Sequence, residues 1–163
     1  MKNYKLPELL SPAGSLEAFE AAIDGGADAI YVGGASFNAR ANAKNFSLDD
    51  LPEVSEISKE YGAKTYLCSN IILNEKLASE LLDNLETIAS SDIDGVILSD
   101  IGLIEEVASH GLEPHISVQE NISNSYTLKT LKKLGAKRAI LSRELSLEEI
   151  TDIAKRSPIE TEI

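Results

Sequence analysis

Polar side chains follow several short apolar runs that the sequence pattern predicts to be strands. Asn70, Asp100 and Gln119 come after three of these runs, and Arg143 and Glu144 come after a fourth. Parallel strands joined by helices bring their carboxyl ends together, and active sites form there. The pattern therefore predicts one substrate site that combines amides, carboxylates and a guanidinium. Glu144 is placed to hold Arg143, whose planar fork suits a carboxylate or a phosphate.

A purely structural interpretation of these residues also exists. Asp and Asn side chains accept hydrogen bonds from the backbone at helix starts, so polar turns follow strands in many proteins without any site there. Capping explains Gln119 and the adjacent Arg143 and Glu144 less well than it explains Asp100. We therefore predict that the five residues contribute to substrate binding.

A longer polar loop follows the second apolar run and carries Arg40 between Phe37 and Phe46. Arg40 has two interpretations, because a guanidinium can bind a substrate carboxylate through two parallel hydrogen bonds or can bridge the loop to Asp49. The position of this loop predicts that it covers the site as a lid.

Standard catalytic sets are absent from the sequence. His110 and His115 do not form an HExxH motif, and His115 lies at the start of a predicted strand, away from the expected site. Both are interpreted as structural. Cys68 is the one cysteine and is predicted to be a buried core thiol. No second cysteine exists to share zinc or an iron–sulfur cluster within these residues, so no metal site is predicted and the catalytic residues are unknown.

Strand-like and helix-like segments alternate along the chain at the spacing of a βα unit. Ser15, Asn74 and Ser146 are predicted helix caps, and Ser47 opens another capping box. Short apolar runs predict strands, the first at residues 9–10 and stopped by Ser11 and Pro12. The others are predicted at residues 29–32, 64–69, 95–98, 115–118, 139–141 and 158–163.

Six βα units and the start of a seventh strand predict an α/β fold, an incomplete (β/α)8 TIM-type barrel with parallel strands. Residues 1–163 are expected to form a single domain, the N-terminal portion of such a barrel, because a complete one takes about 250 residues. A doubly wound open sheet is the alternative. It is disfavoured because neither GxGxxG nor a Walker loop follows the first strand.

Charge and composition restrict the functional classes. The formal net charge is −12, which disfavours a broad phosphate-binding surface. The one dense basic cluster is interpreted as a solvated helix face and helix end; it contains Lys129, Lys132, Lys133, Lys137 and Arg138. A lone cysteine, the lack of a signal-peptide pattern and the lack of a long apolar run predict a cytoplasmic protein with no membrane contact.

Four stretches of this sequence resemble the N-terminal half of the collagenase-like peptidases of family U32. They read ELLSPAGSLEAFEAAIDGGADAIYVGG, FNARANAKNFSLDDL, ISVQENISN and AILSRELSLEEI, and together they cover nearly the whole chain in order. By family name, the resemblance implies a peptidase acting on a peptide substrate. The residues themselves offer no nucleophile–base pair that would carry out proteolysis.

The resemblance also implies two alternatives. Some family members are oxygen-independent hydroxylation proteins that act on ribosomal or transfer RNA, with prephenate implicated, or on a quinone precursor. Their iron–sulfur clusters are held by cysteines that would lie beyond Ile163 here, so no cofactor is expected within this chain. The second alternative is an inactive scaffold fragment.

Because the outermost strands of an incomplete barrel lack partners, the chain is also expected to self-associate.

Overall fold

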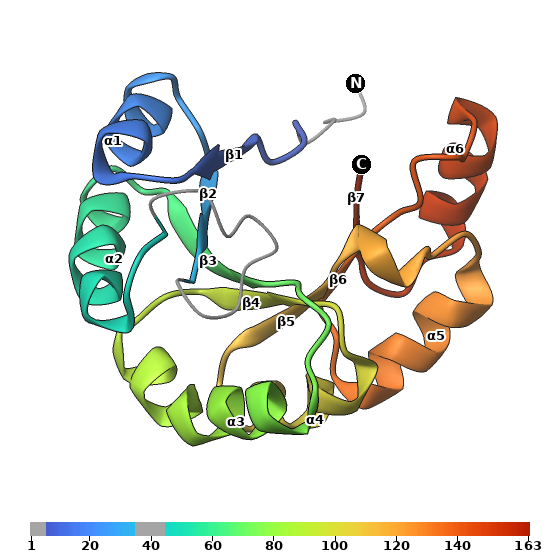
Figure 1. The fold of residues 1–163 in the computed structure, drawn as a ribbon. Helices are drawn as coiled ribbons and strands as arrows, with labels where there is room; N and C mark the ends of the chain where they lie inside the picture. Colours follow the sequence, from blue (N-terminus) through green and yellow to red (C-terminus); the bar gives the residue numbers. More distant parts are fainter. Residues whose placement is uncertain (1–5, 35–44) are drawn as a thin grey trace.

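The computed structural model describes residues 6–34 and 45–163, which alternate between strands and helices (Figure 1). The strands are β1 (Leu10–Ala13), β2 (Ala29–Gly33), β3 (Lys64–Ser69), β4 (Gly95–Leu98), β5 (Glu113–Ile116), β6 (Arg138–Ile140) and β7 (Glu160–Glu162). The helices are α1 (Leu16–Asp24), α2 (Leu51–Glu60), α3 (Glu75–Ser90), α4 (Ile104–Ser109), α5 (Ser125–Leu134) and α6 (Leu147–Arg156). Short 3-10 turns are η1 (Leu48–Asp50), η2 (Ile101–Leu103) and η3 (Val118–Glu120).

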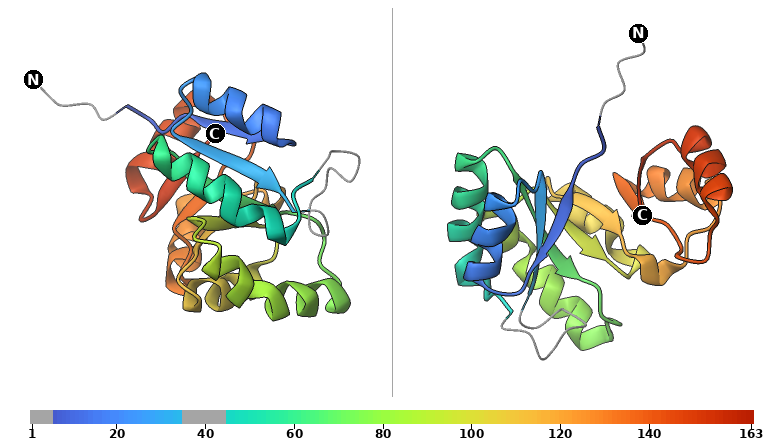
Figure 2. Two further views of the ribbon diagram at one scale, coloured as in Figure 1. Left: turned by 90° about the vertical axis from the view of Figure 1, so that its left-hand side faces the viewer. Right: turned by 90° about the horizontal axis from the view of Figure 1, so that it is seen from above.

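The seven strands form one parallel sheet in the order β1-β2-β3-β4-β5-β6-β7. The sheet curls into an open barrel with the helices on its outer side (Figures 1 and 2). Strand order equals chain order, as in a TIM barrel, whereas a doubly wound sheet reverses its order at a switch point. The prediction of an incomplete (β/α) barrel is therefore confirmed. Within the two described ranges, no helix is long and apolar enough to cross a membrane.

The first strand was predicted to stop at Ser11 and Pro12, and this was wrong. β1 continues through both residues to Ala13, and Pro12 pairs in register with Tyr31 of β2. A proline is tolerated here because β1 lies at the edge of the sheet, where one side of the strand needs no ladder hydrogen bond. The helix caps are confirmed at Ser15, Asn74 and Ser146, whose side chains accept backbone N–H groups.

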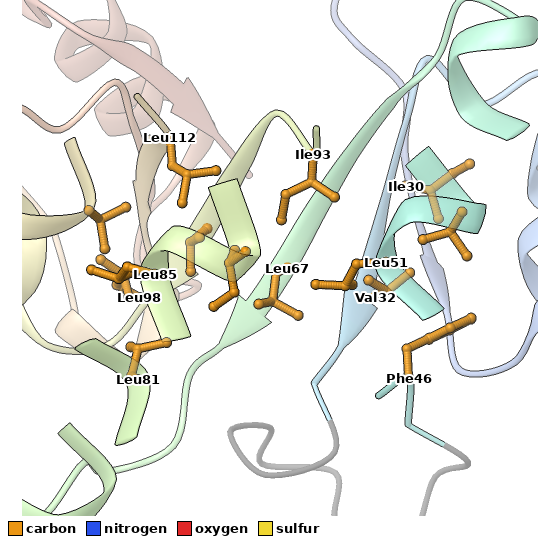
Figure 3. Close-up of a cluster of buried hydrophobic side chains, with 14 of the residues drawn as sticks. Ile30, Val32, Phe46, Leu51, Leu67, Leu81, Leu85, Ile93, Leu98 and Leu112 are labelled. Atoms are coloured by element: carbon orange, nitrogen blue, oxygen red, sulfur yellow. The ribbon is translucent and has the colours of Figure 1, made fainter. Parts of the chain in front are cut away.

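The main apolar core lies between the outer face of the sheet and the helices, as Figure 3 shows. Ile30, Val32 and Leu67 project from the strands toward Leu51 of α2 and Leu81 of α3. Strand residues on this face alternate with residues that face the barrel interior, where Tyr66, Cys68 and Ile97 form a second cluster. Cys68 is buried, as predicted.

At the amino-terminal end of the strands, the barrel interior is ionic rather than apolar. Arg138 of β6 is buried, and its Nη1 lies 2.6 Å from Glu8 Oε1, just ahead of β1. Its Nη2 donates to Glu160 Oε2 of β7 at 2.7 Å. The interpretation of Arg138 as part of a solvated basic face was wrong, because alternation along β6 turns this side chain inward. The neighbouring lysines 129, 132, 133 and 137 are exposed.

Two further groups bind the same Glu8 carboxylate. Lys64 Nζ lies 3.2 Å from Glu8 Oε2, and the Tyr66 hydroxyl donates to Glu8 Oε1 at 3.4 Å. The Arg138 guanidinium also lies over the Tyr66 ring, 5.3 Å from its centroid. Glu8 therefore connects the segment ahead of β1 to β3 and to β6 across the barrel interior.

Tyr66 and His115 meet across the intervening strand β4. Their ring centroids are 4.4 Å apart, although they belong to β3 and β5. The β4 residue in register with Tyr66 is Gly95, which has no side chain to separate the rings. His115 is completely buried, as the structural interpretation expected, and burial lowers its pKa despite Glu113 Oε2 at 3.5 Å from Nε2. The imidazole is therefore neutral near pH 7.

Gly95→Ala should destabilise the fold by about 1–3 kcal/mol, because the added Cβ would lie 2.4 Å from the backbone oxygen of Glu113. Gly102→Ala is the matched control, since its Cβ would meet the movable Asp100 carboxylate at 3.1 Å. Urea unfolding of both variants checks this. Equal losses in the two would show that β4 does not need a glycine at position 95.

Glu8 and Glu162 should respond to neutralisation in opposite directions. Burial acts to raise the pKa of Glu8, but hydrogen bonds and charge from Arg138 and Lys64 outweigh it and the pKa falls below 4.5. A lowered pKa means that the Glu8 carboxylate stabilises the fold above about pH 4.5, and this contribution is lost as the pH falls through the folded pKa. Burial raises the pKa of Glu162, so protonated Glu162 favours the fold and this benefit is lost as the pH rises through the raised value.

At pH 7, Glu8→Gln should therefore lower the free energy of unfolding, and Glu162→Gln should increase it. Both differences from the parent chain should be smaller at about pH 3 than at pH 7, because protonation of these carboxyl groups has advanced at the lower pH. Denaturant titrations at the two pH values provide the measurement. A loss of stability in both variants at pH 7 would contradict this description of the cluster.

Candidate functional site

The predicted site residues all follow the carboxyl ends of neighbouring strands. Asn70 comes directly after β3, Asp100 begins η2 after β4, and Gln119 lies in η3 after β5. Arg143 and Glu144 come after β6. Because the sheet is parallel and its neighbours are consecutive, these turns lie at the same end of the barrel, opposite the Arg138 cluster. We call this end the mouth. That the five residues bind substrate stays a prediction.

Turn chemistry accounts for part of the mouth. Asp100 Oδ1 accepts from the Gly102 N–H at 2.8 Å, so this carboxylate caps η2. Ser117 and Ser142 occupy corresponding places after β5 and β6, and each hydroxyl accepts from the N–H two residues further on at 3.4 Å. Three consecutive strands therefore end in the same kind of side-chain-capped turn. One Asp100 oxygen is used in this way, and the second can accept from a ligand.

Hydrogen bonds also fix the positions of the mouth turns relative to one another. The Ser99 hydroxyl donates to the Ile71 carbonyl at 2.7 Å, which ties the turn after β4 to the segment that carries Asn70. The Ser142 N–H donates to the Ile122 carbonyl at 2.9 Å, next to a bridge between Ile122 and Leu141. The turns after β5 and β6 are therefore held together by buried apolar residues and backbone pairing.

Gln119, Arg143 and Glu144 are exposed at the mouth. Arg143 and Glu144 do not form an ion pair, so the expected support of Arg143 by Glu144 is not present among the described residues. The Arg143 guanidinium is available to a ligand.

Glu120 belongs to the mouth but was not among the predicted site residues. It is half-buried, and both burial and the negative charge of Asp100 raise its pKa. The charge effect shows that the turns after β4 and β5 bring two carboxyl groups near each other. The available sequence signal was the position of Glu120 beside Gln119, in the turn that follows the fifth strand. Asn121 ends this turn with φ 51°, a left-handed conformation that asparagine tolerates.

The remaining sequence candidates lie elsewhere or outside the described residues. Arg40 and Phe37 fall outside the described ranges, so the lid prediction stays untested. Phe46, at the end of the same loop, is buried in the outer core, and its N–H donates to the Gly33 carbonyl at 2.9 Å. His110 is exposed at the end of α4. His115 was predicted to start its strand, and this was wrong, because it is the third residue of β5; its buried ring packs against Tyr66.

The arrangement of the mouth suits recognition of a polar, planar group. The carboxyl groups of Asp100 and Glu120 accept hydrogen bonds, Gln119 both donates and accepts, and Arg143 donates through a rigid fork. Burial, and then the negative charge of Asp100, raise the pKa of Glu120, so this carboxyl group holds its proton to a higher pH than an exposed glutamate does.

Comparisons with known proteins identify the family. The model of peptidase family U32 matches residues 14–163. An uncharacterized protease of Methanocaldococcus jannaschii is 44% identical over 146 residues, which are 90% of this chain and 36% of that protein. The tRNA hydroxylation protein P1 of Bacillus subtilis is 36% identical over 160 residues, or 97% of this chain and 38% of that protein. This chain therefore spans little more than a third of these two curated relatives.

A solved structure of a U32 peptidase matches 99% of this chain and 69% of its own length, with a TM-score of 0.77 and 17% identity. At this identity the match supports the barrel fold and does not address activity. The family model covers most of the sequence, and two curated relatives exceed 30% identity over at least nine-tenths of the chain. This chain belongs to peptidase family U32.

Proposed function

We propose that this chain forms the substrate-binding part of a protein that hydroxylates a tRNA base. The observation that carries the proposal is the match to a tRNA hydroxylation protein along 97% of the chain, including every turn of the mouth. The substrate is an unpaired base, and the full protein reads it by its edges. A cytoplasmic location is part of this proposal.

The chemistry of the mouth is compatible with such a substrate. Proteins recognise RNA sequence mainly at unstacked bases, through hydrogen bonds to their edges. Carboxylates such as Asp100 accept from exocyclic amino groups, while Gln119 and Arg143 donate to ring nitrogens and carbonyl oxygens. The side chains therefore offer both donors and acceptors within one set of turns.

The acidic character of the chain restricts how RNA would bind. With a net charge of −12, attraction to the phosphate backbone is weak. The exposed lysines of α5 stand near the helix end that leads into β6, and so near the amino-terminal end of the barrel. Recognition would therefore depend on local contacts to the base at the mouth, and other parts of the full protein would have to hold the RNA backbone.

An iron–sulfur cluster cannot be held by this chain alone. Such clusters take several thiolates, and Cys68 is the one cysteine, buried on the inner side of β3. We therefore derive no step through a cluster from these residues. In the full protein, a cluster would depend on cysteines outside this sequence.

Deletion of the gene in its own host, followed by mass spectrometry of tRNA nucleosides, tests the proposal. A nucleoside heavier than its parent by one oxygen atom should disappear and should return with a plasmid copy. An unchanged nucleoside profile would refute the tRNA proposal.

Peptidase activity is the second candidate, favoured by the 44% identity to the M. jannaschii protein named as a protease. The purified full protein should be incubated with gelatin, with and without a chelator. Cleavage that persists through repeated purification, together with an unchanged nucleoside profile, would favour the peptidase over the hydroxylation protein. A chain with neither activity would leave the scaffold interpretation.

Substitutions of Asp100 should separate its structural role from binding. Asp100→Ala removes the cap of η2 and should cost about 1 kcal/mol of stability. Asp100→Asn keeps an acceptor for the Gly102 N–H and should change stability by a few tenths of a kcal/mol at most, yet should reduce tRNA hydroxylation in the complemented strain. If Asp100→Asn supports full hydroxylation, the carboxylate acts in the turn alone.

Arg143→Ala should reduce hydroxylation while changing stability by less than about 0.5 kcal/mol, because its side chain is exposed. Arg156→Ala is the matched control, since Arg156 is exposed on α6 and pairs with Asp152 of the same helix. Hydroxylation and melting temperature should be measured for both. Equal hydroxylation levels in the two variants would show that Arg143 does not contribute to substrate binding.

A further inference from the structure

The mouth carries exposed apolar side chains as well as polar ones. After β1, β3, β4, β5 and β6, the segment that leads toward the next helix presents a large hydrophobic residue to solvent. These residues, with their exposed fractions, are Leu16 (37%), Ile72 (92%), Ile101 (41%), Tyr126 (77%) and Leu147 (74%). Because the strands are parallel neighbours, these segments lie at one end of the barrel. We call the five side chains the apolar rim.

The turns at the opposite end of the barrel treat their apolar residues differently. Ile93 and Leu112, in the turns that lead into β4 and β5, are buried. Within the part of the chain that the structure describes, Tyr61 is the exposed large hydrophobic residue of these helix-to-strand turns, with an exposed fraction of 66%. Exposed apolar residues that gather on one surface often mark a binding site. The rim therefore indicates a ligand that approaches the mouth and offers apolar faces.

Two rim residues are held in place by their neighbours. The carbonyl of Ile71 accepts from the Ser99 hydroxyl at 2.7 Å, which fixes the segment that carries Ile72. Lys129 Nζ lies 5.3 Å from the centroid of the Tyr126 ring, and this cation–π contact orients the ring. A side chain that is already held in place loses little conformational freedom when a ligand binds. Both positions are therefore preorganised for a contact.

The arrangement of the rim favours single rings over a protein partner. Each rim residue belongs to a different turn and has polar neighbours, such as Asp100 beside Ile101 and Asn70 near Ile72. The rim is therefore a series of separate contacts, whereas a protein interface has one apolar centre. A second copy of this chain, mouth to mouth, would also bring the carboxyl groups of Asp100 and Glu120 against the same groups, and like charges disfavour such contact. Unpaired nucleobases have apolar faces and polar edges, and proteins bind both.

We propose that the apolar rim binds the unpaired nucleotides on either side of the target base, with their bases stacked on Tyr126 and Ile72. This inference rests on the proposed function, because the target base then occupies the polar centre of the mouth. Bases removed from a stack lose their neighbours, and aromatic or apolar side chains replace these. Such contacts do not need the positive charge that this acidic chain lacks. The occupant is a single-stranded loop of RNA.

Three fluorescently labelled RNAs provide the probe. The first is a hairpin with an unpaired loop, the second is the same hairpin with abasic nucleotides in the loop, and the third is a duplex of the same sequence. The purified full protein should bind the unpaired loop about tenfold more tightly than the other two, because the bases supply most of the contact and the phosphates little. Fluorescence anisotropy measures the three affinities.

Tyr126→Ser should weaken binding of the unpaired loop about tenfold, whereas Tyr126→Phe should retain it because the ring remains. Tyr61→Ser is the matched control, since Tyr61 is a similarly exposed tyrosine at the opposite end of the barrel. The loss in Tyr126→Ser should be the same factor at about 50 and about 200 mM salt, because no phosphate contact is removed. Circular dichroism establishes that the variants fold. Should Tyr126→Ser fail to fold, Ile72→Ser gives the same test in a different turn.

Equal affinities for the three RNAs, or equal affinities of Tyr126→Ser and Tyr61→Ser for the unpaired loop, would overturn the proposal. Self-association of the full protein that Tyr126→Ser abolishes would overturn it in favour of a second copy. The proposed function fails on a different result, which is an unchanged tRNA nucleoside profile in the deletion strain. Base-dependent binding together with that unchanged profile would refute the reaction and support the rim as a site for unpaired RNA.

Discussion

The contact between Arg138 and Glu8 is the constraint on which the curl of this sheet depends. These residues belong to β6 and to the segment ahead of β1, so they are far apart in strand order, and yet their charged atoms lie 2.6 Å apart. A charge as buried as Arg138 must be paired, because an unpaired one would lose its hydration without compensation. Flattening the sheet would separate Arg138 from Glu8 and leave this guanidinium with Glu160 of the neighbouring strand as its close partner. The ring of Tyr66 packs against the guanidinium, and Gly95 leaves room for that ring to reach His115.

The two ends of the barrel consequently have different roles. At the amino-terminal end, the buried Arg138 binds Glu8 and Glu160, and Lys64 adds a second cation at Glu8. At the mouth, Gln119, Arg143 and Glu144 are exposed, and the turns that carry them are fixed by buried residues and by backbone pairing. In parallel barrels, one end of the strands usually serves stability, and the other end carries the polar groups of the site. Side chains in the mouth turns can therefore be substituted without disturbing the ionic interior.

Glu120 adds a second carboxyl group, beside that of Asp100, to the capped turns of the mouth. Its carboxyl group shares the mouth with Asp100, and burial, followed by the negative charge of Asp100, raises the pKa of Glu120. In an acidic chain local hydrogen bonding, rather than attraction to phosphates, is the physically reasonable basis for contact with RNA.

Much of the architecture was predictable because it depends on local patterns. Caps such as Ser15 and Asn74 are chemical signals within a few residues, and strict alternation of strands with helices leaves few topologies. The end of β1 was mispredicted, since whether a proline is tolerated depends on the strand lying at the sheet edge, which is not a local property. Parallel topology also predicted a common end of the barrel for the site candidates, because parallel strands share the direction of their carboxyl ends. These candidates are Asn70, Asp100, Gln119, Arg143 and Glu144.

Tertiary structure decided where the charges are. In the sequence Arg138 stands beside exposed lysines, and nothing nearby shows that it turns inward to meet Glu8, which is 130 residues away. The proximity of Asp100 and Glu120 likewise comes from two different turns. Local propensity specifies which residues form strands and caps. Pairing of charges across a barrel depends on the curl of the whole sheet, and that curl exists only once the chain has folded.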